Sequence, residues 1–257
     1  MAPDASPRDR LTPGDAVDAD AAGAVGDDFV VRRIIGPDMV TPGGPYFSED
    51  GHLPPPGRAA DCVPILDGGA ETRAAELLAL GCRRVLLGEP ALRDPSTVSR
   101  ISDRCGEPGR VGLRVRCVRA EVGWSMDCES NADFRFMRPT RCEPDWELVD
   151  AGGARTGTLV RWWLREMFDR GAADALIQVD IVDDADLNIA AGLVDDFGER
   201  LWFAPLTDRR PDLDACVRWG HVRRWAFPSA IVDADPALAA RCDRTPAPRS
   251  PVAEDAA

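Results

Sequence analysis

The sequence predicts an α/β fold, a (β/α)8 barrel of the TIM type, on three observations. Short apolar runs alternate with segments of helical period, which is typical of a parallel sheet whose strands are joined by helices. Gly81 and Gly171 follow two of the helical segments, where a left-handed residue ends a helix. The number of repeats and the length of 257 residues favour a closed barrel over an open doubly wound sheet.

The elements are expected within one domain that covers residues 29–243 and carries an insertion at about 120–145. Residues 1–28 and 244–257 are rich in Ala, Pro and Asp without an apolar period, so both tails are predicted to be disordered. Between Thr158 and Gly171 a helix is expected, with Thr156 or Thr158 as its cap. Strands are expected at 29–35, 63–66, 84–87, 111–118, 175–181, 201–204 and 222–227, and further helices at 72–80, 94–103, 189–197, 213–219 and 235–242.

One stretch does not fit the alternation. Residues 36–60 are crowded with Pro and Gly and predict a long irregular segment, which is unusual inside a compact domain. The segment is too short and too rich in Pro for a helix, a strand and a second helix. The barrel is therefore predicted to be truncated or distorted near strand two, with one strand of eight missing as the extreme case.

Composition excludes several classes of function. The formal net charge of -13 does not favour binding to nucleic acid or to an anionic membrane. No apolar run is long enough to span a bilayer, and the acidic start lacks the basic-then-apolar pattern of a signal peptide, so a cytoplasmic protein is expected. The chain contains no lysine, and its eight cysteines form no Cys-x-x-Cys pair. Neither a metal nor a cofactor is predicted.

Ligands of (β/α)8 barrels bind at the C-terminal ends of the strands, among the loops that lead into the helices. Arg114 is expected to form an ion pair with Asp180 or Asp183 there, because a buried charge without a partner is costly. Five tryptophans are expected to pack helices against the barrel rather than to form a binding face, namely Trp162, Trp163, Trp202, Trp219 and Trp225. The candidate site residues at these strand ends are Asp38, Gly68, Gly69, Gly88, Arg114, Asp180 and Asp183.

Several segments resemble a known family when their order and spacing are taken together. Arg33-Ile34-Ile35, Asp67-Gly68-Gly69, the run 75–85, the run 91–95 and Gly171-Ala172 are similar to segments of the histidine-biosynthesis barrels. The resemblance is to the cyclase subunit of imidazole glycerol phosphate synthase first, and to the phosphoribosylformimino-aminoimidazole carboxamide ribotide isomerase next. It covers roughly residues 29–232 and implies a barrel that acts on a substrate with a phosphate at each end.

The resemblance implies two aspartates for general acid/base work, at the ends of strands one and five. The strand-five position is Arg114 here, and a guanidinium stays protonated at any working pH, so it cannot act as a base. Asp38 lies one place early for the strand-one aspartate. The lysine that the family has shortly after strand one is absent.

Phosphate binding is predicted to be half lost. The family binds each phosphate with a Gly-rich loop whose N–H groups face the anion, here called a grip. The first grip matches Gly68, Gly69 and Gly88, although an ordinary tight turn explains Gly68-Gly69 equally well. The second grip, a Ser-Gly-Gly in the family, reads Ala204-Pro205-Leu206-Thr207, and Pro removes a donor. Asp180 is interpreted either as a ligand contact or as a solvated loop carboxylate.

Three functions follow from these matches and departures. The first is a degenerate barrel without the parent activity, which binds one phosphorylated small molecule or serves as a non-catalytic partner. The second is an active cyclase-like lyase or sugar-phosphate isomerase, with Asp38 and Asp183 as the carboxylate pair and Arg114 holding an anion. The third is an interaction module, because the family's cyclase docks a glutaminase through the N-terminal face of its barrel, where Arg33, Arg84 and Asp174 align with charged positions.

Overall fold

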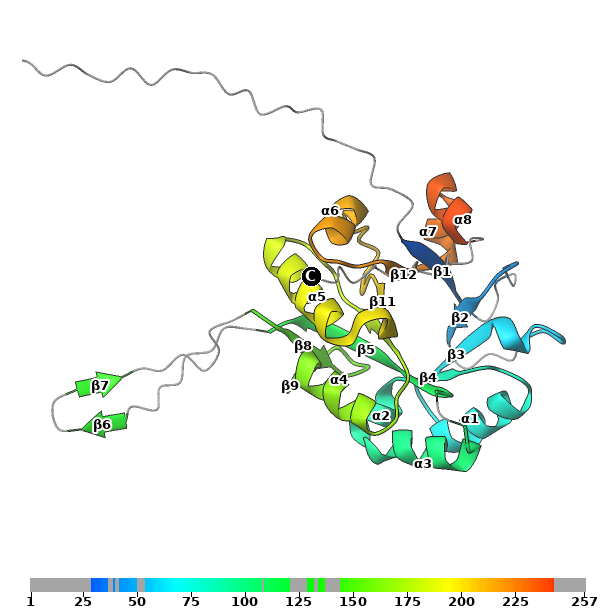
Figure 1. The fold of residues 1–257 in the computed structure, drawn as a ribbon, viewed down its shortest axis with the longest axis horizontal. Helices are drawn as coiled ribbons and strands as arrows, with labels where there is room; N and C mark the ends of the chain where they lie inside the picture. The colour runs from blue at the N-terminus through cyan, green and yellow to red at the C-terminus, as the bar shows by residue number, and fades with distance from the viewer. Residues whose placement is uncertain are drawn as a thin grey trace, which may run out of the picture.

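The computed structural model describes residues 29–36, 39, 42–49, 54–107, 109–120, 129–131, 134–136 and 144–242 (Figure 1). Eight parallel strands form a closed ring, because β5 pairs with β10 as well as with β4, and β12 pairs with β1. The predicted (β/α)8 barrel is confirmed. In ring order the strands are β1 (Val30–Ile35), β2 (Tyr46–Ser48), β3 (Cys62–Leu66), β4 (Val85–Leu87), β5 (Val111–Arg119), β10 (Ala175–Gln178), β11 (Leu201–Ala204) and β12 (Arg224–Pro228).

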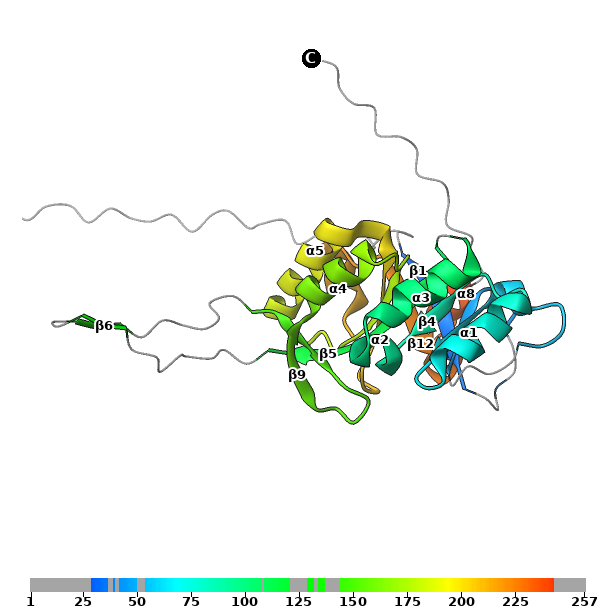
Figure 2. The ribbon, with the colours of Figure 1, turned by 90° about the horizontal axis from the view of Figure 1, so that it is seen from below.

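Helices lie around the outside of this ring (Figures 1 and 2). The predicted cap of α4 is wrong: Leu159 occupies the N-cap position without a side-chain hydrogen bond, and Thr156 and Thr158 belong to a strand. Within the described residues no helix is long and apolar enough to cross a membrane. The helices are α1 (Ala70–Ala79), α2 (Glu89–Arg93), α3 (Ser96–Cys105), α4 (Val160–Asp169), α5 (Asp184–Phe197), α6 (Leu213–Arg218), α7 (Ser229–Asp233) and α8 (Pro236–Cys242), with 3-10 turns η2 (Ala59–Asp61) and η3 (Gly198–Arg200).

The region of strand two is distorted but keeps its strand. β2 has only three residues, and it pairs in parallel with both β1 and β3. In the described residues on either side of β2 no α-helix occurs; Glu49 has 3-10 geometry, and the short η2 precedes β3. The extreme case of a missing strand is therefore wrong, since the ring has all eight. A run of three residues within a Pro-rich segment is too short to show the alternation from which a strand is predicted.

A hairpin extends the ring at β5. β8 (Trp146–Val149) runs antiparallel to the second half of β5, and β9 (Arg155–Leu159) runs antiparallel to β8. Residues 120–145, the predicted insertion, precede this hairpin. The part of that insertion which the structure describes includes β6 (Glu129–Asn131) and β7 (Phe134–Phe136), which pair with each other as a separate two-stranded sheet. The hairpin β8–β9 places α4 against the outside of β5.

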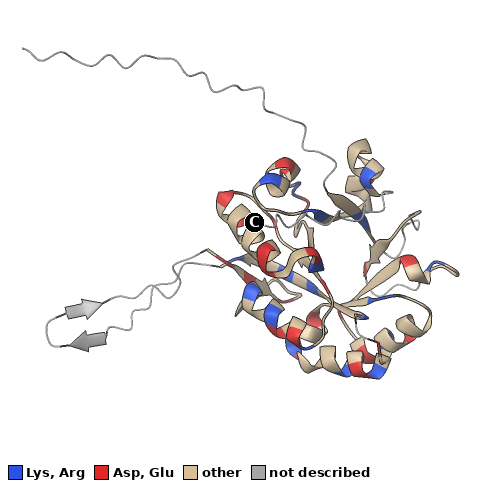
Figure 3. Cartoon of the chain, in the orientation of Figure 1, with Lys and Arg blue, Asp and Glu red and all other residues tan. Residues whose placement is uncertain are grey.

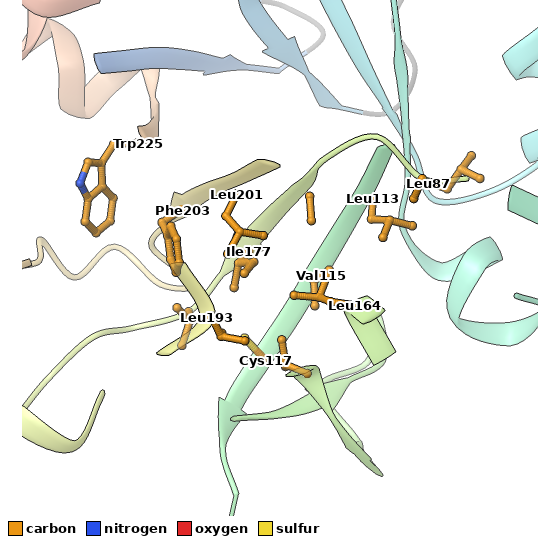
Figure 4. Packing of buried hydrophobic residues seen from close by; sticks show 14 of the residues in the cluster. Leu87, Leu113, Val115, Cys117, Leu164, Ile177, Leu193, Leu201, Phe203 and Trp225 are labelled. Carbon is orange, nitrogen blue, oxygen red and sulfur yellow. The ribbon is translucent and has the colours of Figure 1, made fainter. Parts of the chain in front are cut away.

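Alternation along the strands builds two hydrophobic layers. Outward-facing residues pack under the helices, as Figure 4 shows for Leu113, Val115 and Cys117 of β5 beside Leu164 of α4. Trp163 and Trp225 are buried in the outer layer, as predicted. The prediction is wrong for the other three tryptophans, because Trp202 lies in the inner layer and Trp162 and Trp219 are more than half exposed. Inside the ring lie Ile34, Phe47, Ile65, Leu86, Leu176, Trp202, Ala204 and Ala226.

Candidate functional site

Arg114 lies inside the ring at the mouth of the barrel. In β5 it alternates with the outward-facing Leu113 and Val115, and it is in register with Leu176 of β10. Its Nε donates to Oε1 of Gln178 at 2.7 Å, and its Nη1 forms an ion pair with Oδ2 of Asp67. Its side chain is only 11% exposed. The prediction of a partner in Asp180 or Asp183 is wrong, because Arg114 pairs with Asp67, which directly follows β3.

Gly88 leaves the space that the Asp67 carboxylate occupies. A Cβ atom at residue 88 would overlap Oδ1 of Asp67 and would lie 3.6 Å from Cδ of Arg114. The Gly88 N–H donates to the carbonyl of Leu66 at 3.0 Å. Neither its space nor its amide is therefore open to a ligand in this arrangement.

A small cavity adjoins the Arg114–Asp67 pair. Its walls include Gly88, Leu92, Arg116, Leu148 and Trp163, and its volume is about 20 Å³, which holds about one water molecule. Arg116 follows Arg114 on the inward face of β5, and its Nη1 donates to the Ala151 carbonyl at 3.0 Å. The Nε of Arg116 is buried and has no hydrogen-bond partner among the described residues. A water molecule in the cavity is a suitable acceptor for it.

Gly68 and Gly69 form the open part of the mouth. Both are exposed, and neither has another heavy atom within 4 Å of where a Cβ would stand. Gly69 has a φ of 57°, which an L residue rarely adopts, and it is the N-cap of α1. No side chain caps α1, so the backbone N–H groups of its first turn are left for water or an anion.

Glu89 does not point its charge at this open loop. Its Oε2 accepts from the Ala151 N–H at 2.9 Å, and its Oε1 accepts from Arg93 at 2.8 Å. The carboxylate therefore ties α2 to the β8–β9 turn. These two partners reduce the repulsion between Glu89 and an anion bound at the loop.

Asp180 follows β10, and its carboxylate reaches the loop that follows β11. Its Oδ1 accepts from the backbone N–H groups of Leu206 and Thr207 at 3.0 and 3.1 Å, and its Oδ2 accepts from the Thr207 hydroxyl at 2.8 Å. The two amides bind an anion, and that anion is the protein's own carboxylate. In this structure the Asp180 carboxylate accepts from three internal donors.

Asp183 is the N-cap of α5 and the partner of Arg119. Its Oδ1 accepts from the N–H groups of Ala185 and Asp186, and the guanidinium of Arg119 binds both of its oxygens. The Arg119 hydrogen bonds lower the pKa of Asp183 to about 2. The carboxylate is therefore ionised and engaged. Asp38, its predicted partner in general acid/base catalysis, lies outside the described residues.

The sequence did not predict the residues that form hydrogen bonds and ion pairs with the arginines of the mouth. Asp67 and Gln178 bind Arg114, yet Asp67 was read only as part of a turn. Asp186 is buried and accepts from the Trp146 indole N–H at 3.0 Å, from the Val182 N–H and from Arg119. Strand alternation is a usable signal for Gln178, because it lies two residues after the inward-facing Leu176. In the part of the chain that the structure describes, no group of three His, Cys, Asp or Glu side chains is placed to hold a metal ion.

The charged residues predicted at the N-terminal face separate into two pairs. Arg84 precedes β4 and forms an ion pair with Asp174, which precedes β10. Arg33 instead lies on the outer side of β1 and pairs with Asp233 of α7. Only the first pair therefore belongs to the opening of the ring.

Comparison with known proteins supports the resemblance read from the sequence. Imidazole glycerol phosphate synthase subunit HisF of Cronobacter sakazakii is 26% identical over 132 residues, which are 48% of this chain and 43% of that protein. A phosphoribosyl-imidazole-4-carboxamide isomerase of Frankia casuarinae is 41% identical over 73 residues, which are 27% of this chain and 29% of that protein. The matched segments thus span less than half of either relative. No protein-family model matches the chain.

Proposed function

Starting from its sequence relationship to the two histidine-biosynthesis barrels, we propose that this chain has lost the parent cyclase or isomerase reaction and keeps a grip for one phosphorylated small molecule. The observation that carries the proposal is the residue at the strand-five position. Arg114 stands where the resemblance places a catalytic aspartate, and Asp67 and Gln178 hold it inside the mouth.

The guanidinium of Arg114 cannot replace the acid in its role. General acid/base catalysis needs a group that exchanges a proton near the working pH, and a guanidinium does not do so. The carboxylate that pairs with Arg114 is that of Asp67, and this ion pair and the hydrogen bond to Gln178 engage the guanidinium. The remaining cavity of about 20 Å³ is far smaller than the several hundred cubic ångströms of a usual ligand pocket.

The second phosphate grip is occupied by Asp180. Its carboxylate accepts from the N–H groups of Leu206 and Thr207, the donors that a phosphate would need at that loop. A phosphate there would meet a fixed negative charge, and Pro205 has no N–H to offer. These contacts support the loss of a substrate that carries a phosphate at each end.

The first grip supports binding of a single phosphate. Gly68 and Gly69 leave open space before α1, and the uncapped first turn offers backbone N–H groups at the positive end of the helix dipole. The neighbouring carboxylates have partners of their own: Asp67 binds Arg114 and Glu71 binds Arg100. A phosphate monoester therefore meets donors without a free carboxylate at this loop.

The binding of ribose 5-phosphate, measured by titration calorimetry, tests this proposal. The variant Gly68→Asp adds a negative charge at the grip without steric overlap and without a left-handed backbone angle. Ala79→Asp adds the same charge at the exposed far end of α1 and is the matched control. We expect saturable binding to the wild type and to Ala79→Asp, and at least a tenfold weaker affinity for Gly68→Asp. Equal affinity in all three proteins, or no binding to the wild type, would overturn the proposed grip.

A further inference from the structure

The opposite end of the barrel holds an excess of positive charge. Three arginines reach the inside of the ring at the N-terminal ends of the strands: Arg32 of β1, Arg84 before β4 and Arg224 of β12. Asp174 is the carboxylate they surround, and each of the three interacts with it electrostatically. Arg224 also pairs with Glu199, whose carboxylate is 3.9 Å away and mostly exposed. Three guanidiniums therefore face one buried and one exposed carboxylate, in a protein whose formal net charge is -13. Figure 3 shows basic positions on the strands of the ring as well as on the outer helices.

Arg32 is the cation in this group that lacks a polar partner. Its guanidinium lies over the ring of Trp202, 4.2 Å from the centroid, and 5.6 Å from that of Phe47. Within the described residues no acceptor oxygen takes a hydrogen bond from it and no carboxylate lies within ion-pair distance. A guanidinium carries five N–H donors, so this group keeps a large unused capacity for an anion.

The burial of the Arg32 guanidinium beside a second cation is energetically unfavourable unless an anion compensates the charge. Burial, and then the nearby charges of Arg224 and Arg84, lower the pKa of Arg32 to about 10, so the side chain is still a cation at neutral pH. Arg224 lies beside the same indole, 5.1 Å from the Trp202 centroid, which brings two like charges onto one ring. An anion between them would relieve the repulsion and would use the open donors of Arg32.

The cluster is open to solvent at this end. The side chains of Arg84 and Arg224 remain about one third exposed, whereas Asp174 is buried beneath them. Arg84 is held in place by two contacts, the ion pair to Asp174 and a hydrogen bond from its Nε to the Gly109 carbonyl at 2.9 Å. A free anion can therefore approach from water and meet guanidiniums whose positions are already fixed.

We propose that the N-terminal end of the barrel is a binding site for a free oxyanion of the size of phosphate or sulfate, held by Arg32, Arg84 and Arg224. Guanidinium groups suit such an anion because their planar fork of donors matches two oxygens at a time. The net charge of the protein repels anions at long range, so binding here depends on the local cluster. The site is separate from the mouth and does not rest on the function proposed above.

Titration calorimetry with inorganic phosphate in the background of Gly68→Asp tests this inference, because that change removes the proposed grip at the mouth. We expect one phosphate per chain to bind Gly68→Asp. Adding Arg32→Met should weaken this binding at least tenfold. Arg33→Met in the same background is the matched control, since Arg33 is the next residue, faces outward and pairs with Asp233; it should leave the affinity unchanged.

The outcomes separate this inference from the proposed function. Absence of phosphate binding in Gly68→Asp, or unchanged binding after Arg32→Met, overturns the oxyanion site and shows that Arg32 only stacks on Trp202. Binding in the wild type that is lost entirely with Arg32→Met, and unaffected by Gly68→Asp, overturns the mouth grip and leaves this site standing. Circular dichroism verifies that each variant is folded, and Arg32→Lys, which keeps the charge, should retain measurable binding if Arg32→Met does not fold.

Discussion

Each end of the barrel combines a glycine, an aspartate carboxylate and arginine guanidiniums, but the two ends differ in how many guanidiniums they hold and in how exposed the carboxylate is. At the mouth, Gly88 makes room for the Asp67 carboxylate, which pairs with Arg114. At the N-terminal end, Gly112 of β5 makes room for the Asp174 carboxylate, which pairs with Arg84. The Asp67 side chain is 37% exposed, whereas Asp174 is buried, so the carboxylate of the first pair reaches water and that of the second does not.

The two ends also differ in their ratio of guanidiniums to carboxylates. At the mouth, the two guanidiniums of Arg114 and Arg119 pair with three carboxylates, those of Asp67, Asp183 and Asp186. At the N-terminal end, Asp174 stands among several guanidiniums, and its Oδ1 has no hydrogen-bond partner among the described residues. Carboxylates therefore outnumber guanidiniums in the ion pairs of the mouth, whereas at the N-terminal end Arg32, Arg84 and Arg224 outnumber Asp174 and Glu199.

Of the substitutions that test this comparison, Asp174→Asn should have the largest effect on the free energy of unfolding. The change leaves Arg84 and its neighbours without a buried counter-charge, and we expect a loss of about 3 kcal/mol in the free energy of unfolding. Urea unfolding measures it. Added phosphate should restore part of the loss, because an oxyanion can take the place of the carboxylate. A loss below 1 kcal/mol, or no effect of phosphate, would contradict the description of this end as short of negative charge.

Substituting Gly112 and Gly88 by Ala, one at each end of the barrel, should give the second largest effect on the free energy of unfolding. A Cβ at residue 112 would overlap the buried Asp174 carboxylate and would also crowd Leu86, so Gly112→Ala should cost about 2–3 kcal/mol in unfolding free energy. A Cβ at residue 88 meets the exposed Asp67 carboxylate, which can rotate into water. Gly88→Ala should therefore cost about 1 kcal/mol or less. Equal losses in urea unfolding would show that the two carboxylates are equally constrained.

Replacing Asp67 by Asn should have a smaller effect. The pair that it forms with Arg114 is partly exposed, and such pairs contribute at most about 1 kcal/mol. We expect a decrease in unfolding free energy within that limit, and Gln178 should keep its hydrogen bond to Arg114. A loss near that of Asp174→Asn would mean that the mouth depends on its ion pair as much as the other end does.

The smallest effect concerns pH. The pKa of Asp183 is lowered to about 2 from its ordinary value of 3.8, chiefly by the hydrogen bonds from Arg119. The contribution of this carboxylate to stability is therefore complete above pH 4 and is lost as the pH falls through 2. Asp183→Asn, which keeps a capping side chain, should be less stable than the wild type at pH 5 and equally stable near pH 2. Thermal unfolding at both pH values measures this, and a difference that persists at pH 2 would contradict it.

The sequence predicted the ring but not the contacts within it. Alternation of apolar runs and helices was enough for the (β/α)8 barrel, because each repeat carries its own periodic signal. β2 was missed, since Tyr46–Ser48 is too short to show a period among prolines. The partner of Arg114 was predicted incorrectly because ion pairs across a ring depend on loop geometry, and the chain offers several aspartates at neighbouring strand ends. Asp180 and Asp183 are used internally, which residue type alone does not reveal.

The most direct test of the central claim, that the mouth has lost the parent chemistry, is an assay of cyclase turnover with ammonia and the substrate that carries a phosphate at each end. The wild type and Arg114→Ala should be measured side by side at high protein concentration. The account predicts that both proteins convert no substrate above the rate in buffer. Turnover by the wild type that Arg114→Ala abolishes would contradict it, because Arg114 would then take part in the reaction.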